Sequence, residues 1–172
     1  MRIHHIIYLS FFLMISCISS HTKNGEIRTR QSFDFNWKFH YGEIEDAQEQ
    51  KYDDHDWRTL DLPHDWSIEG KYDKNNTSGW HSGFLPGGIG WYRKTFLWKN
   101  SWKNKEVTVS FDGIYMNSEV WINGHYLGKR PYGYISFYYD LTPYMKRGEN
   151  VIAVRVDNSK QPSGDPFFDP PV

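Results

Sequence analysis

Val120-Trp121-Ile122-Asn123-Gly124-His125 is the stretch that decides the fold of this chain. Asn123 and Gly124 both tolerate a positive φ angle, and such a pair between two apolar runs is the strongest short-range signal for a β-hairpin. The stretch therefore predicts strands at residues 120–122 and 126–128, joined by a tight turn.

Further strands are predicted on both sides of this hairpin. Residues 150–156 form a β-branched run after the turn at Arg147-Gly148 and are typical of a buried strand. Alternation and apolar runs predict other strands at residues 33–40, 59–62, 90–98, 106–111 and 135–139. A short helical turn is expected at residues 142–146, with its N-cap at Asp140 or Thr142. The pattern indicates an all-β domain.

Several spaced motifs occur in a fixed order, and together they resemble a known family. They are Leu62–Trp66, Phe84–Phe96, Ser110–Ile114, the hairpin above, Asp140–Tyr144 and Gly148–Val154. The series resembles the N-terminal sugar-binding domain of family 2 glycoside hydrolases, in particular the β-galactosidases, over roughly residues 30–159. The resemblance implies a jelly-roll β-sandwich that is galactose-binding-domain-like. It leaves the glycoside open among galactosides, glucuronides and mannosides.

A chain of 172 residues is one domain's worth of sequence. The family's catalytic barrel alone needs about 250 residues, so the resemblance implies a fragment that lacks the barrel. Family members hydrolyse O-glycosyl bonds with two glutamates that both lie on the barrel. Glu43, Glu45 and Glu49 fall in a polar run at residues 43–56 that is typical of solvated surface. We expect no catalytic residue, cofactor or metal in this chain, and no activity from it alone.

His64 and Asp65 are candidate contacts to a sugar or to the catalytic barrel, because they follow Pro63 at a predicted strand end. The alternative is structural: Asp65 accepts backbone N–H groups in the turn, and His64 satisfies a neighbour within the domain.

Residues 68–90 form the longest irregular stretch, and such loops are often functional. Gly87 and Gly88 would let the backbone approach another surface closely, and the resemblance implies that this loop faces the barrel. The resemblance also places an asparagine of some galactose pockets near Gly87, a contact absent here. A tight turn before a strand is the alternative. Exposed indoles at Trp80, Trp91 or Trp102 would instead favour a stand-alone carbohydrate-binding module, and their burial would favour the hydrolase domain or an inert scaffold.

The N-terminus predicts export. Arg2 precedes an apolar run within residues 1–20 that is typical of a signal peptide, and Cys17 resembles the lipidated cysteine of a bacterial lipoprotein. A chance cysteine in an ordinary signal peptide is the alternative. We expect a periplasmic or cell-surface protein, with an outer-membrane lipoprotein as the anchored form and a flexible tether at residues 21–30. A net charge of −1 gives no reason for nucleic-acid binding.

The domain is expected to span residues 31–160, and residues 161–172 depart from the pattern. Proline stands at positions 162, 166, 170 and 171, where the resemblance implies a final hydrogen-bonded strand. We interpret this segment as an atypical, disordered tail, so that the sandwich lacks a strand.

Overall fold

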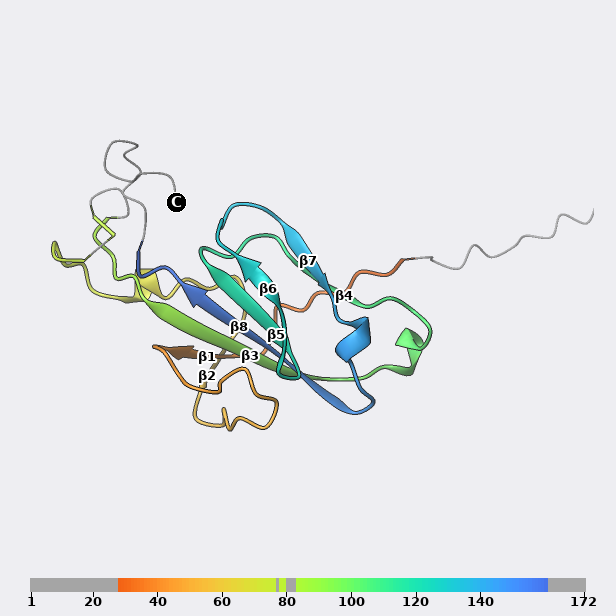
Figure 1. Cartoon of the computed structure of the whole chain (residues 1–172). Coiled ribbons are helices and arrows are strands. Elements are labelled where there is room, and N and C mark those ends of the chain that lie inside the picture. Colours follow the sequence, from red (N-terminus) through yellow and green to blue (C-terminus); the bar gives the residue numbers. More distant parts are fainter. Residues whose placement is uncertain (1–27, 77, 80–82, 161–172) are drawn as a thin grey trace, which may run out of the picture. The chain divides into compact units, whose positions relative to one another are not determined.

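The computed structural model describes residues 28–76, 78–79 and 83–160 (Figure 1). The chain divides into two units, Met1–Gln31 and Ser32–Val172. The described part of the first unit, residues 28–31, contains no helix or strand. The predicted signal peptide with Cys17, the candidate Trp80 and the predicted tail lie outside the described residues. The part of the chain that is described holds no helix long and apolar enough to cross a membrane.

The second unit is all-β in the described residues, which confirms the predicted fold class. Its strands are β1 (Trp37–Tyr41), β2 (Arg58–Leu60), β3 (Ile89–Leu97), β4 (Thr108–Phe111), β5 (Ser118–Ile122), β6 (His125–Arg130), β7 (Phe137–Asp140) and β8 (Glu149–Asp157). Three short 3-10 helices are described between them: η1 (Ser67–Glu69), η3 (Asn100–Trp102) and η4 (Thr142–Tyr144).

The strands form two antiparallel sheets. The larger sheet has the order β2-β1-β3-β8-β5-β6, and β4 pairs with β7 in the smaller one (Figure 1). β3 and β8 pair along their full nine residues, from Ile89 opposite Asp157 to Leu97 opposite Glu149. The last strand therefore lies in the middle of the sheet, between β3 and β5, as in a jelly-roll β-sandwich rather than a simple meander.

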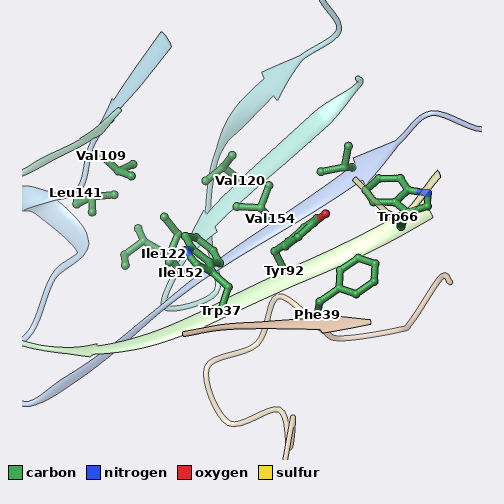
Figure 2. Close-up of a cluster of buried hydrophobic side chains, with 11 residues drawn as sticks. Trp37, Phe39, Trp66, Tyr92, Val109, Val120, Ile122, Leu141, Ile152 and Val154 are labelled. Carbon is green, nitrogen blue, oxygen red and sulfur yellow. The ribbon is translucent and has the colours of Figure 1, made fainter. Parts of the chain in front are cut away.

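The core lies between the two sheets. Ile152, Val154 and Val156 alternate along β8 and point to the same side as Val120 and Ile122 of β5. The side chains of Val109, from β4, and Leu141, which follows β7, complete the same cluster, so the small sheet covers this face of the large one (Figure 2). Trp37 packs beside Ile152 and Ile122, and Phe39, Tyr92 and Trp66 extend the cluster toward the other end of the sheet.

The opposite face of the large sheet is covered by the loop at residues 43–57. Ala47 and Trp57 of this loop pack on Trp91 and Ala153 and are buried with them. Glu43, Glu45 and Glu49 are exposed, as predicted for a solvated run, while Ala47 between them is fully buried against the sheet.

The Asn-Gly hairpin is confirmed: β5 and β6 flank Asn123 and Gly124, whose φ angles are 52° and 83°. The strand predicted at residues 33–40 begins only at Trp37. Asn36 has a φ angle of 59°, which ends the extended run that strict alternation implied. The N-cap of η4 is Leu141, while Asp140 accepts a 2.9 Å hydrogen bond from the backbone N–H of Thr142.

Candidate functional site

The turn that carries His64, Asp65 and Trp66 connects β2 to η1. Asp65 Oδ1 accepts a 2.8 Å hydrogen bond from the backbone N–H of Ser67, so this carboxylate shapes the backbone that leads into η1. Asp65 therefore accepts a backbone N–H group within its own turn, which is the role that the sequence analysis gave as the alternative to a sugar or barrel contact.

His64 is enclosed by the domain, with 9% of its side chain exposed. Its Nε2 lies 2.7 Å from Arg58 Nη2, and its Nδ1 lies 2.8 Å from the Tyr92 hydroxyl. Its Nε2 also lies 3.2 Å from Glu69 Oε1, so the imidazole contacts Arg58, Glu69 and Tyr92. Burial raises the pKa of the Tyr92 hydroxyl above its ordinary value, which keeps this group protonated.

Arg58 also pairs with Glu69 through two hydrogen bonds, of 2.9 and 3.0 Å. The hydrogen bond from Arg58 is the main cause that lowers the pKa of Glu69, with a smaller effect from His64. The four side chains of Arg58, His64, Glu69 and Tyr92 thus form one network that ties β2, η1 and β3 together.

Next to this network lies an open cleft of about 480 Å³, here named the Trp66 cleft, formed by β1, β2, η1, Gly70 and Pro86. Trp66 stacks on Phe39 with ring centroids 5.9 Å apart and an angle of 22° between the planes. The Arg58 guanidinium lies over the Phe39 ring as well, 5.3 Å from its centroid. The cleft wall is therefore aromatic, with a charged pair beside it.

The indole nitrogen of Trp66 has no hydrogen-bond partner among the described residues although it is buried. In Figure 2 this nitrogen lies on the side of the ring that is turned away from Tyr92. Native proteins rarely leave a buried donor unpaired.

Gly87 and Gly88 attach their loop to the end of β8. The backbone N–H of Gly88 donates to Asn158 Oδ1 at 2.7 Å, and the backbone N–H of Asn158 donates to the Gly88 carbonyl at 2.9 Å. A Cβ atom on Gly87 would lie 2.7 Å from the Asn158 carbonyl oxygen, and one on Gly88 would lie 2.6 Å from the Tyr41 hydroxyl. The backbone at these glycines does approach another surface closely, as predicted, but that surface belongs to the same unit and consists of Asn158 and Tyr41.

The structure thus places His64, Asp65, Gly87 and Gly88 at one end of the large sheet, where β8 ends. Sequence reasoning missed Arg58, Glu69, Tyr92 and Asn158, because their contacts to this region span 5 to 70 residues of sequence. The short separation between Arg58 and the histidine turn is the one signal that could have pointed to this network.

In the described residues, no group of three or more His, Cys, Asp or Glu side chains could hold a metal ion.

The indoles proposed for stacking differ in exposure. Trp91 is buried, at 3% exposed, and Trp102 is half-buried against Phe96 and Trp98. The buried Trp91 presents no free ring face of the kind that would favour a stand-alone carbohydrate-binding module, whereas Trp102 is only partly covered.

Comparison with known proteins identifies relatives over most of the described unit. The family model for "Glycosyl hydrolases family 2, sugar binding domain" matches residues 30–165. Beta-galactosidase BoGH2A of Bacteroides ovatus is 57% identical over 137 residues, which are 79% of this chain and 16% of that protein. A putative beta-glucuronidase of Formosa agariphila is 51% identical over 136 residues, covering 79% of this chain and 13% of the relative.

Solved structures of glycosidases also superpose on this chain. The crystal structure of a beta-glycosidase from Bacteroides vulgatus superposes with a TM-score of 0.73 and 60% identity, over 75% of this chain and 17% of that one. A Bacteroides uniformis beta-glucuronidase superposes with a TM-score of 0.67 and 30% identity, over 76% of this chain and 15% of its own. The chain spans only 13–17% of the length of these relatives.

Proposed function

Because the chain belongs to family 2 of the glycosyl hydrolases, through that family's N-terminal sugar-binding domain, we propose that it serves a catalytic domain that hydrolyses O-glycosyl bonds. The surface that it offers to that domain and to the sugar is the end of the large sheet that carries the Trp66 cleft, His64 and the Gly87-Gly88 loop.

One observation carries this proposal: the paired hydrogen bonds between Gly88 and Asn158 fix the glycine loop beside the end of β8. The matched domain is N-terminal in the family, so a relative's remaining chain leaves the domain at this end. A catalytic domain that follows would therefore start next to the loop and next to the Trp66 cleft.

The charge of the cleft supports a neutral glycoside as the substrate. Arg58 is the arginine among the residues that form the cleft, and Glu69 already pairs with it through both oxygens. A glucuronide carboxylate would have to compete with Glu69 for this cation and would also face Asp56. A β-galactoside carries no such charge, and since the B. ovatus relative that is 57% identical is a β-galactosidase, we propose β-galactosides as the preferred substrate class.

A domain exchange tests the proposal. Residues 30–160 of this chain would replace the matching domain of the B. ovatus β-galactosidase, and nitrophenyl β-galactoside and β-glucuronide would serve as substrates. We expect the chimera to retain β-galactosidase activity, and Arg58→Ala in it to raise KM more than it lowers kcat. Arg147→Ala, at an exposed position outside the cleft, is the matched control. A folded chimera without activity, or an Arg58→Ala chimera with unchanged KM, would contradict the proposal.

The purified chain alone should hydrolyse neither substrate. A retaining glycosidase needs two carboxyl groups about 5 Å apart on either side of the bond, and the resemblance places both on the catalytic barrel. Turnover above that of a heat-inactivated sample, abolished by replacing one glutamate of this chain, would overturn this expectation.

We also propose export, with lipid attachment at Cys17 as the means of anchoring. Support comes from Arg2 and the apolar run after it, which have the order of charge and hydrophobicity found in signal peptides. One acyl chain alone gives only marginal membrane binding, so a stable anchor needs the several chains that a bacterial lipoprotein carries.

A further inference from the structure

A second cleft, of about 430 Å³, lies on the face of the large sheet that the 43–57 loop partly covers. It shares no lining residue with the Trp66 cleft. Its floor is a row across three strands, in which Arg155 of β8 lies between Trp91 of β3 and Glu119 of β5. We name it the Trp121 cleft, after the indole on β5 that closes one side.

A ladder of aromatic rings begins in this cleft with Trp91 and Trp121 and continues beyond its lining residues to Tyr126. Trp121 lies opposite Ala153, whose methyl group leaves room for the indole to reach across β8. Trp91 and Trp121 therefore stack, with centroids 5.4 Å apart and an angle of 28° between their planes. Tyr126 of β6 continues the ladder, 5.4 Å from Trp121. Trp91 is buried, whereas Trp121 is half-buried and Tyr126 is 52% exposed, so the outer end of the ladder presents ring surface to solvent.

Polar groups beside the ladder are held in place by hydrogen bonds. Trp91 Nε1 donates to Glu43 Oε1 at 3.0 Å, and Arg155 Nε donates to Glu43 Oε2 at 2.9 Å. Glu43 thereby fixes the Arg155 guanidinium in the floor of the cleft. Arg155 reaches Asp157 at 3.5 Å as well. A polar group that is already oriented loses little entropy when it binds a ligand.

Glu119, the third member of this row, is held among the described residues by two ion pairs, both to its Oε1, rather than by hydrogen bonds. Its carboxylate lies 3.6 Å from Arg155 Nη1 and 3.7 Å from Lys129 Nζ, distances longer than a hydrogen bond. Its second oxygen is therefore available to a hydroxyl donor, while the Trp121 ring in the cleft and the Tyr126 ring packed against it offer apolar contact. This combination of ring surface and a fixed acceptor matches the two faces of a pyranose.

We propose that the Trp121 cleft is a second saccharide site, which binds a neutral oligosaccharide away from the end of the sheet assigned to the catalytic domain. The match to a sugar-binding family agrees with this ligand class. Carboxylates exceed cations in the cleft, since Glu43, Glu45, Asp46 and Glu119 stand against Arg155. A uronic acid or sulfated sugar would be repelled, so the site discriminates against anionic glycans.

Titration of the purified chain tests the site, with tryptophan fluorescence and calorimetry as readouts. The probes are cellotetraose, β-1,4-galactotetraose and tetragalacturonate. At least one neutral tetrasaccharide should bind saturably at millimolar concentrations, and tetragalacturonate should not. Trp121→Ala should weaken binding about tenfold, which corresponds to about 1.4 kcal/mol. Glu119→Gln should weaken it less, because an amide oxygen still accepts a hydrogen bond.

Controls separate this site from the proposed function and from loss of fold. Tyr126→Ala tests the ladder at an exposed position, in case Trp121→Ala unfolds, and Tyr138→Ala is its matched control on β7, at 68% exposed. Arg58→Ala alters the Trp66 cleft and should leave oligosaccharide binding unchanged. The proposal is wrong if no neutral probe binds, if Tyr126→Ala binds as tightly as Tyr138→Ala, or if tetragalacturonate binds as well as the neutral sugars.

Discussion

Arg93 Nε donates a 2.8 Å hydrogen bond to Asp54 Oδ2, which joins β3 to the loop at residues 43–57. The same guanidinium donates to the backbone carbonyls of Ala47, Glu49 and Tyr52, and only 1% of the arginine is exposed. One cation on the sheet thus satisfies four acceptors of the loop. Arg93 thereby ties the loop to the face of the sheet that carries Trp91 and Ala153.

Arg93→Ala should therefore lower the free energy of unfolding by about 3 kcal/mol, since removing one partner leaves buried acceptors unpaired. Urea unfolding measures the loss, and limited proteolysis should show earlier cleavage within residues 43–57. The exposed Arg147 offers the control, and Arg147→Ala should change stability by less than about 0.5 kcal/mol. Equal stability of the two variants would show that the loop is held by its apolar contacts alone.

Gly87→Ala should destabilise the domain by about 1–3 kcal/mol, because the new methyl group would lie 2.7 Å from the Asn158 carbonyl oxygen. Gly148→Ala is a useful comparison. Gly148 has a φ angle of 91° but no atom within 4 Å of its added Cβ, so its cost comes from backbone strain alone. Thermal unfolding compares the two variants. An amide chemical-shift change at Asn158 and Ser159, restricted to Gly87→Ala, would locate the clash, and its absence would argue against the contact.

Glu43→Gln should remove a part of the stability that depends on pH. The hydrogen bond from Arg155 holds the pKa of Glu43 below its ordinary value. A carboxyl group with a lowered pKa in the folded state stabilises that state above its unfolded pKa, and this contribution is lost as the pH falls through the folded pKa. The variant should be less stable than the wild type by up to about 1 kcal/mol at neutral pH, since half of the Glu43 side chain is exposed.

The same difference should shrink as the pH falls from about 5 to about 3, where Glu43 of the wild type becomes protonated. Urea unfolding at several pH values measures it. A difference that stays constant down to the lowest pH would show that Glu43→Gln perturbs packing rather than the ion pair.

Cys17→Ala should change the partitioning of the expressed full-length chain between detergent and water. If Cys17 is acylated, the wild type enters the detergent phase of a Triton X-114 extraction and the variant stays in the aqueous phase. Secretion of both forms is expected, because the apolar run after Arg2 is unchanged. Equal aqueous partitioning of the two would remove the lipid anchor and leave export intact.

Local sequence signals determined much of the fold. The Asn123-Gly124 pair specifies its hairpin because both residues adopt positive φ angles, whatever lies around them. The β-branched run that became β8 likewise follows from residues that are adjacent in the chain. Alternation was misleading at residues 33–36, because a period-two pattern does not register that Asn36 turns the backbone.

Tertiary structure alone decided the two clefts. His64 meets Tyr92 across 28 residues of sequence, and Gly88 meets Asn158 across 70. Trp91 and Trp121 stack only because β8, the last strand, inserts between β3 and β5 and places the small Ala153 beneath them. Periodicity shows which side chains share a face of one strand. Which strands become neighbours depends on the pairing of distant segments, so the sequence determined the strands and the family, and the pairing determined which residues meet.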